Sequence, residues 1–339
     1  MILTVDLAER SYDIMIERGA HLRAGEYLDL DRRVLVVTDE GVPAEYARRV
    51  ADACRDAVIV TVPQGEGSKS IAEFEHLLTV MLEHGFTRRD CVVAVGGGVV
   101  GDLSGFAASA YMRGVDFYNI PTTSLSQIDS SIGGKTAVNM CGIKNIVGSF
   151  YQPKRVLIDT DMLSTLSHRQ LASGLCEAVK MAATFDAELF SMFERDDVYE
   201  HIDDIIARSL LIKKRVVEED EREGGLRRVL NFGHTLGHGI EAEEELHGLY
   251  HGECVALGML PMCSQKVRTR LTAVLERLGL PTKFTFDADR VMGAAMHDKK
   301  ADGSGVTVVI VDEIGTFELR RMTYAELSDR LTSFIKETR

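Results

Sequence analysis

The sequence predicts two domains: an α/β domain over residues 1–164 with a mainly parallel, Rossmann-like sheet, and a mostly α-helical domain over residues 165–339. Three observations support this prediction. The chain has 339 residues, about twice the usual size of a single domain. Its first half alternates short β-branched runs with segments of helical period. Its second half consists mostly of long helical periods.

The first half follows a βαβ pattern. Each short run is apolar at nearly every residue, as in strands that helices cover on both faces. The glycine- and serine-rich stretch before the last run is typical of a functional loop. We expect strands at residues 34–37, 58–62, 91–95, 117–120 and 156–158, and helices at residues 44–54 and 70–84.

The second half begins its helical character near Ser167. Two short apolar runs late in the chain flank a glycine and predict a small hairpin, followed by a final helix. We expect helices at residues 168–185, 201–221, 227–245, 252–266, 268–278 and 324–338, and hairpin strands at residues 306–311 and 316–319.

Composition narrows the class of partner. The formal net charge of -13 disfavours a nucleic-acid surface or a basic membrane anchor, so a small ligand is expected. The six cysteines form no C-x-x-C pair, so neither a disulfide framework nor a zinc ribbon is expected. The reducing cytoplasm fits this pattern best. The sequence has neither a signal-peptide pattern at its start nor a run of about 18 apolar residues.

A glycine loop follows the expected strand 91–95. Gly96, Gly98 and Gly101 satisfy G-x-G-x-x-G and open a helical segment, where free N–H groups favour a pyrophosphate. The loop follows about the third expected strand and not the first, so the standard dinucleotide fingerprint is not reproduced. Two interpretations stay open: an atypical NAD site, or a tight turn that binds nothing.

A histidine cluster is the strongest sign of a metal. His234 and His238 lie four residues apart on one expected helix face, and His251 follows with Glu253 two residues later. Imidazoles near carboxylates suit zinc. The local pattern alone favours His234 and His238 as two zinc ligands. The alternative is that both are helix histidines that bind no metal and have their hydrogen bonds made within the protein.

Basic residues lie in or beside these segments although the chain is acidic. The spacing of Glu177 and Lys180, taken without the other basic residues, favours an i,i+3 ion pair on the surface. If the basic side chains converge, they form a pocket for a ligand with several negative charges, such as a phosphorylated sugar acid. They are Arg113, Lys135, Lys144, Lys180, Lys213 and Arg227.

Together these motifs resemble the 3-dehydroquinate synthase family nearly end to end. The resemblance rests on Gly96-Gly-Gly-Val-Val-Gly-Asp102, Tyr111-Met-Arg-Gly114, Pro121-Thr-Thr123, Asp129-Ser-Ser-Ile-Gly-Gly-Lys-Thr136, Lys144-Asn145, Tyr151-Gln-Pro153, Gly174 to Lys180, Asp220 to Leu226, Asn231 to His238, and His251-Gly-Glu253. One departure is Ile143, where the family usually has glycine, which puts the shape of that loop in doubt.

The resemblance implies a zinc site of Glu177, His234 and His251, with cobalt as an alternative metal, and assigns His238 to the substrate instead. It implies catalytic or substrate-contacting roles for Arg113, Asp129, Lys135, Asn145, Lys180, Lys213, Arg227, Asn231, His238 and one lysine of Lys299-Lys300, with Lys300 preferred. It implies NAD contacts from Asp39, Glu66, Lys69, Gly97, Gly98, Asp102, Thr122, Thr123, Lys135, Lys144, Thr165 and Gln170.

The family's reaction belongs to the shikimate pathway of aromatic amino-acid biosynthesis. It converts 3-deoxy-D-arabino-heptulosonate 7-phosphate to 3-dehydroquinate and phosphate through transient oxidation by NAD, phosphate elimination, re-reduction and intramolecular aldol closure. We therefore expect a cytoplasmic lyase that works as a homodimer. Two other activities remain open: another sugar-phosphate cyclase, or a metal-dependent NAD polyol dehydrogenase of the same fold. A non-catalytic binding protein of this fold is the third alternative.

Overall fold

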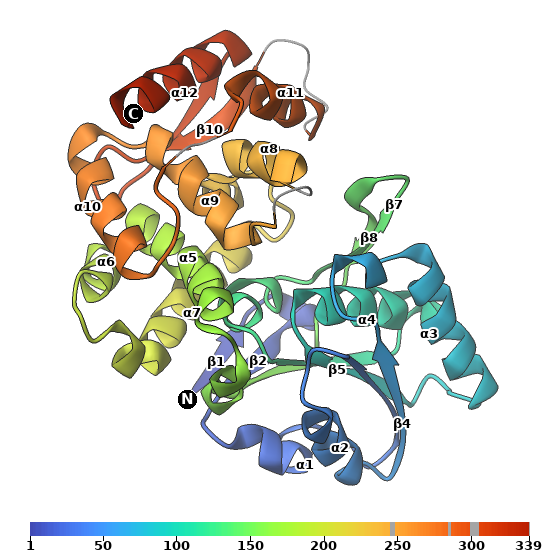
Figure 1. Ribbon diagram of the computed structural model, residues 1–339. Helices are drawn as coiled ribbons and strands as arrows, with labels where there is room; N and C mark the ends of the chain where they lie inside the picture. Colours follow the sequence, from blue (N-terminus) through green and yellow to red (C-terminus); the bar gives the residue numbers. More distant parts are fainter. Residues whose placement is uncertain (245–247, 284–285, 299–304, 339) are drawn as a thin grey trace. The chain divides into compact units, whose positions relative to one another are not determined.

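The computed structural model describes residues 1–244, 248–283, 286–298 and 305–338, which form two compact units (Figure 1). Unit 1 contains Met1–Leu166 and Lys213–Glu218, and unit 2 contains Ser167–Ile212 and Glu219–Arg339. Helix α7 (Ile202–Glu219) therefore contributes a segment to each unit. None of the helices described is long and apolar enough to cross a membrane.

Unit 1 is built on a seven-stranded sheet with the strand order β1-β2-β9-β6-β5-β3-β4. Every pair of neighbours is parallel except β1 and β2, so the mainly parallel sheet is confirmed. The strands are β1 (Ile2–Val5), β2 (Tyr12–Ile16), β3 (Arg33–Asp39), β4 (Asp56–Val62), β5 (Cys91–Gly96), β6 (Asp116–Pro121) and β9 (Arg155–Ile158). The pair β1–β2 was not predicted, and it makes the glycine loop follow the fifth strand of the chain.

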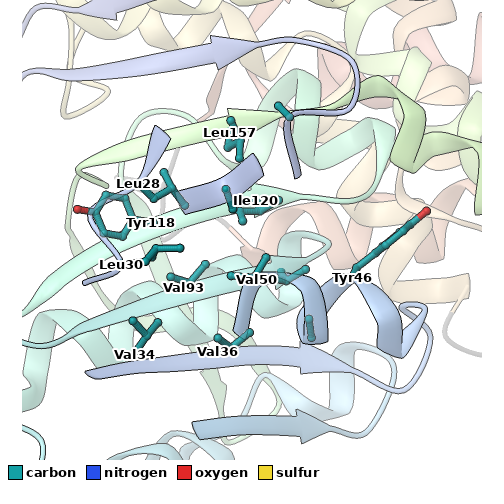
Figure 2. Close-up of a cluster of buried hydrophobic side chains, with 14 of the residues drawn as sticks. Leu28, Leu30, Val34, Val36, Tyr46, Val50, Val93, Tyr118, Ile120 and Leu157 are labelled. Carbon is teal, nitrogen blue, oxygen red and sulfur yellow. The ribbon is translucent and has the colours of Figure 1, made fainter. Parts of the chain in front are cut away.

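Helices cover both faces of this sheet. Val34 and Val36 of β3 lie in a cluster with Val50 of α2 (Ala44–Asp52), on the face shown in Figure 2. Leu35 and Val37 belong to a second cluster, with side chains of α3 (Ile71–Glu83) and α4 (Gly98–Ala110). Because neighbouring residues of a strand point to opposite faces, a strand buried on both sides must be apolar at every position. The continuous apolar runs were therefore a correct strand signal.

The stretch expected to be one functional loop contains an antiparallel hairpin of β7 (Lys135–Met140) and β8 (Ile143–Phe150), so that prediction was wrong. Cys141 and Gly142 have φ of 53° and 76°, as a two-residue hairpin turn of type I′ requires. Ile143 is 54% exposed and simply opens β8. The hairpin is anchored through Val138, which packs in the cluster that includes α4.

Unit 2 is mostly helical, as expected. Its helices are α5 (His168–Phe185), α6 (Ala187–Phe193), most of α7, α8 (His234–Glu244), α9 (His251–Met259), α10 (Gln265–Arg277), α11 (Ala288–Asp298) and α12 (Tyr324–Thr338). The expected hairpin is present as β10 (Val306–Ile310) and β11 (Glu318–Met322), with its second strand a few residues later than predicted.

Two of the expected helices are broken. The first contains a 3-10 segment (Leu226–Asn231) before α8, because Gly233 takes a left-handed φ of 79°. A Cβ atom at Gly233 would lie 2.5 Å from Met259 Cγ, so a side chain there would collide with α9. The second ends before Cys263, whose extended backbone pairs with Val311. Both breaks depend on tertiary contacts that a helical period does not record.

Candidate active site

Three helices of unit 2 bring Glu177, His234 and His251 together. One ligand atom of each lies within 4.8 Å of the other two. Glu177 belongs to α5, and the histidines are the first residues of α8 and α9. Glu177 Oε1 lies 3.8 Å from His234 Nε2 and 3.6 Å from His251 Nε2. The structure thus groups the three residues that the family resemblance selected.

The second nitrogen of each imidazole is held by a hydrogen-bond acceptor. His234 Nδ1 lies 3.2 Å from the carbonyl oxygen of Phe232, and His251 Nδ1 lies 3.1 Å from Glu241 Oε2. These contacts fix the orientation of both rings, with each Nε2 turned toward Glu177. Burial lowers the pKa of His251, but Glu177 and Glu241 together raise it to about 10, so a metal that binds there must displace the Nε2 proton of that ring. The orientation is the one that metal-binding histidines use.

The donor set fits a zinc ion. Two ligands that each lie about 2.1 Å from a tetrahedral zinc are about 3.4 Å apart, close to the separations between Glu177 and the two histidines. Glu177 Oε1 is buried and has no hydrogen-bond partner among the described residues. An orphaned carboxylate oxygen between two imidazole nitrogens is what a three-ligand metal site requires.

Glu177 and Lys180 form a buried ion pair, with side chains 1% and 2% exposed. Their interpretation as a surface pair is therefore wrong. Burial alone raises the pKa of Glu177, but Lys180 and then His234 hold it well below its usual range. Burial and Lys180 also lower the pKa of His234 well below its usual value, which keeps that imidazole neutral. A carboxylate and a neutral imidazole are the forms that bind a metal.

Close backbone contacts bring these helices together. A Cβ atom at Gly252 of α9 would lie 1.9 Å from the carbonyl oxygen of Ser173 in α5. A Cβ atom at Gly258 of α9 would lie 2.1 Å from the carbonyl oxygen of Gly233, next to α8. Helix α9 therefore needs glycine at both crossings, and these crossings place His251 against Glu177.

In unit 1, the glycine loop lies where the sequence placed it, between β5 and the first turn of α4. A Cβ atom at Gly97 would lie 3.1 Å from Thr123 Cγ2, and one at Gly98 would lie 3.0 Å from Ser130 Oγ. The N–H groups of the first turn of a helix attract anions. Because Gly97 and Gly98 have no side chains, an anion can approach the N–H groups at the start of α4.

An ion pair borders this loop. Lys69 Nζ lies 2.5 Å from Asp102 Oδ2, and Lys69 is buried. Burial raises the pKa of Asp102, and the charge of Lys69 opposes that shift. Asp39, at the end of β3, likewise has its pKa raised by burial. These three residues lie at the carboxyl ends of parallel strands or just after them, the usual ligand edge of such a sheet.

The other predicted cofactor residues lie on several separate elements. The backbone N–H of Thr122 donates to the carbonyl oxygen of Gly96 at 2.9 Å, which joins β6 to the glycine loop. Thr165 ends a 3-10 segment (Thr160–Thr165) after β9. Gln170 belongs to unit 2, where its side chain accepts from Ser167 in the capping box that starts α5. The structure therefore gives Gln170 a local capping role.

Asp129 and Lys213 form another of the predicted groups. Asp129 lies in a π-helical turn (Ser126–Ser130), a geometry that often marks functional sites. Lys213 Nζ lies 2.6 Å from Asp129 Oδ1 and also donates to the Asp129 carbonyl oxygen. Gln127, in the same turn, donates to the carbonyl oxygens of Pro121 and Asp159 at 3.1 Å and 2.8 Å. Gln127 thereby fixes the turn to the ends of β6 and β9.

The remaining predicted residues of unit 1 lie on two exposed segments. Lys135 begins β7, and Lys144 and Asn145 lie near the start of β8. Arg113 ends a 3-10 segment (Tyr111–Arg113) and has a left-handed φ of 71°. A left-handed backbone is uncommon for a residue with a side chain and indicates a constraint worth testing for function.

The remaining predicted residues of unit 2 surround the loop before α8. Arg227 is buried, and its N–H donates to Asp220 Oδ2 at 3.0 Å. Asn231 Nδ2 donates to Glu223 Oε1 at 2.6 Å. The His238 ring centroid lies 5.3 Å from that of His234, yet His238 is outside the three-residue group. The predicted Lys299 and Lys300 lie outside the described residues.

Comparison with known proteins identifies the family. Models of the 3-dehydroquinate synthase N-terminal and C-terminal regions match residues 59–173 and 174–301. The chain is 38% identical, over an alignment of 353 residues, to a 3-dehydroquinate synthase of Streptococcus suis strain 05ZYH33. That alignment covers 98% of this chain and 99% of the relative. The chain belongs to the 3-dehydroquinate synthase family.

Solved structures show the same architecture for this member of the 3-dehydroquinate synthase family. A 2-deoxy-scyllo-inosose synthase complexed with carbaglucose-6-phosphate, NAD+ and Co2+ is 25% identical with a TM-score of 0.89, and the match covers 98% of this chain and 100% of that one. The 2-epi-5-epi-valiolone synthase of Streptomyces hygroscopicus subsp. jinggangensis 5008, with NAD+ and Zn2+ bound, is 28% identical with a TM-score of 0.87, covering 98% and 99%. The predicted fold class is confirmed.

Sequence inspection of this 3-dehydroquinate synthase family member missed two polar residues beside the predicted site. Glu241 contacts His251, and Glu223 contacts Asn231. Glu241 lies seven residues after His234 and thus on the same face of α8, which was a usable signal. Glu223 had no such signal, because its contact depends on the loop that Asp220 closes.

Proposed function

We propose that this protein is a 3-dehydroquinate synthase, a carbon–oxygen lyase that converts 3-deoxy-D-arabino-heptulosonate 7-phosphate to 3-dehydroquinate and phosphate. The observation that carries the proposal is the buried, orphaned Glu177 Oε1 facing two imidazole nitrogens in a chain of this family. Catalytic NAD and a divalent metal, zinc or cobalt, are the proposed cofactors. The NAD+ with Co2+ or Zn2+ in the two similar synthases supports them.

We assign the two cofactors to different parts of the chain. Residues 1–164 would bind NAD, with its pyrophosphate at Gly97 and Gly98 and further contacts from Lys69 and Asp102. Residues 165–339 would hold the metal and most of the substrate, with Glu177, His234 and His251 as ligands. A metal bound there supplies Lewis-acid stabilisation of negative charge on a substrate oxygen.

The chain's own side chains have separable roles in this proposal. Lys180 holds Glu177 Oε2, so that Oε1 is presented to the imidazoles. Lys180 and His238 would relay a proton. The anionic phosphate end suits Arg113, Lys135, Asn145 and His238, and the carboxylate and hydroxyls suit Lys213, Arg227 and Asn231. Asp129 orients Lys213 through their 2.6 Å contact.

Two other activities make different predictions in one assay. We would incubate the zinc-loaded protein with catalytic NAD+ and the heptulosonate phosphate, and follow inorganic phosphate and NADH together. A dehydroquinate synthase releases phosphate over many turnovers without accumulating NADH. Stoichiometric NADH would instead identify a polyol dehydrogenase. Phosphate release from a hexose or other heptulose phosphate alone would identify another sugar-phosphate cyclase.

The metal assignment has a separate test. Glu177 Oε1 lies 3.6 Å from His251 Nε2, whereas His238 is outside the group of three potential metal ligands. We expect purified His251→Ala to contain no zinc and purified His238→Ala to retain it, as measured by atomic absorption. Loss of zinc from both variants would restore His234 and His238 as the ligand pair.

We further propose that the protein is a cytoplasmic homodimer that binds neither nucleic acid nor membranes. The acidic net charge supports the absence of nucleic-acid and membrane partners, and six cysteines without a disulfide bond support the cytoplasm. Light scattering of the purified protein measures the oligomeric state directly, and a monomer at working concentration would contradict the dimer.

A further inference from the structure

The β7–β8 hairpin contains a bulge that bears two of the predicted ligand residues. Val138 pairs with Val147 and Met140 pairs with Ile143, so the register shifts between these two pairs. Residues 144–146 of β8 therefore lie opposite Asn139 alone. A bulge of this kind interrupts the ladder and redirects side chains, and bulges recur beside active sites. Here the redirected residues include Lys144 and Asn145.

The side chain of Asn139 replaces the missing ladder contact. Its Oδ1 accepts a hydrogen bond of 2.8 Å from the backbone N–H of Asn145. Asn145 has a left-handed φ of 56°, which is costly unless its surroundings hold it. Asn139 is thus the side chain that fixes the shape of the bulge.

Asn139 is also bound to the segment that precedes α3. Its Nδ2 donates to Glu66 Oε1 at 2.8 Å, and its backbone N–H donates to the carbonyl oxygen of Lys69 at 2.8 Å. Lys69 in turn pairs with Asp102 in the first turns of α4. One residue therefore connects the bulge to the proposed cofactor segment through three hydrogen bonds.

We infer that Asn139 is a positioning residue that couples the cofactor segment at Glu66–Lys69 to the anion-binding bulge at Lys144–Asn145. The inference rests on the proposed function. Glu66 and Asn145 are both exposed, and the side chain of Asn139 bonds to each of them. A ligand that orders one segment lowers the cost of ordering the other, and cofactor and substrate then favour each other's binding.

The coupling is measurable without turnover. The proposed reaction begins with NAD+, so NADH and the heptulosonate phosphate form a complex that cannot start the reaction. The chain contains no tryptophan, so NADH fluorescence is read without interference from indole. We would titrate the zinc-loaded protein with NADH, with and without saturating heptulosonate phosphate. In the wild type we expect the phosphate compound to tighten NADH binding about five-fold, the factor of one net hydrogen bond.

Two variants of Asn139 separate its contacts. Asn139→Ala removes both side-chain bonds and is expected to abolish the coupling. Asn139→Asp keeps the acceptor for Asn145 but sets a carboxylate against Glu66, so coupling is lost again. Adding Glu66→Gln to Asn139→Asp restores a donor to that pair, and we expect part of the coupling to return. A merely structural role would not produce this rescue.

A matched control tests whether any weakened hairpin has the same effect. Ser149 Oγ donates to Ser109 Oγ at 2.8 Å and ties the same hairpin to α4, away from the cofactor segment. Ser149→Ala should keep the wild-type coupling. Thermal melts of all variants confirm that they are folded.

The possible failures are distinguishable. Wild-type protein that neither binds NADH nor releases phosphate defeats the proposed function itself. Wild-type protein that turns over normally but shows no coupling, or an Asn139→Ala variant that keeps it, overturns only the inference about Asn139.

Discussion

The substitution Gly252→Ala tests how α5 and α9 position the proposed metal ligands. The added Cβ atom would lie 1.9 Å from the carbonyl oxygen of Ser173 and 2.7 Å from its carbonyl carbon. Carbon and oxygen atoms in contact are roughly 3 Å or more apart, so the helices must separate by about 1 Å, which is a form of overpacking. The separation also strains the hydrogen bond of 3.1 Å from Gly252 N–H to Ser173 Oγ.

The energetic consequences follow from these distances. Overpacking costs about 1–3 kcal/mol, and the lost hydrogen bond adds about 1 kcal/mol, so we expect a destabilisation of about 2–4 kcal/mol. Metal sites tolerate deviations of only about 0.2 Å in ligand distance. Because His251 starts α9 and Glu177 lies on α5, we expect zinc affinity to fall by about 100-fold or more, at least as much as the loss of an orienting partner costs.

Zinc affinity is measured by competition with a fluorescent chelator, and stability by urea unfolding of the metal-free protein. Gly293→Ala in α11 is the matched control, because a Cβ atom there meets no atom within 4 Å. In a helix interior it should stabilise the protein by about 0.5–1 kcal/mol and leave zinc binding unchanged. If Gly252→Ala binds zinc and unfolds like the wild type, the glycine contact does not fix this crossing.

Two further predictions concern carboxylates that contact a histidine. Glu241→Ala removes the acceptor for His251 Nδ1 at 3.1 Å and should weaken zinc binding about 10–100-fold in chelator competition, while an unchanged affinity would show that Glu241 does not orient the imidazole. Asp159 is fully buried; burial alone would raise its pKa, but the hydrogen bonds from His21 and from backbone N–H groups lower it below the usual value. Its stabilising contribution is therefore complete above about pH 4 and is lost as the pH falls through the lowered pKa. In urea unfolding, Asp159→Asn should cost about 1–3 kcal/mol at pH 7, and its difference from the wild type should shrink below pH 4; a difference that does not vary with pH would contradict this account.

The sheet of unit 1 was predictable because burial on both faces leaves a direct trace in the sequence. Strands β3 and β5, which are buried along almost their whole length, appear as nearly unbroken apolar runs between helical segments. The hairpin β7–β8 was not predictable in this way. Only one of its faces is buried, its exposed face carries polar and apolar residues alike, and its anchoring at Val138 depends on α4.

The proposed site shows the same division. Local spacing favoured His234 and His238 as a ligand pair, since an i,i+4 relation is visible in one helix. Resemblance to the family replaced His238 with His251 and added Glu177, and the structure groups those three residues. That they bind zinc stays a prediction.

By itself, the sequence determined the two-part architecture, the glycine loop between β5 and α4, and most of the polar residues proposed for the site. Only the tertiary structure decided which of those residues meet. The deciding contacts are close approaches of backbone, such as Gly252 against Ser173 and Gly258 against Gly233. A glycine in a linear pattern indicates freedom of conformation, but the partner that requires its missing side chain lies on another helix. Such pairings are properties of packing, so no local pattern in this chain indicated the grouping of Glu177, His234 and His251; the family resemblance proposed it, and the packing of α5, α8 and α9 produces it.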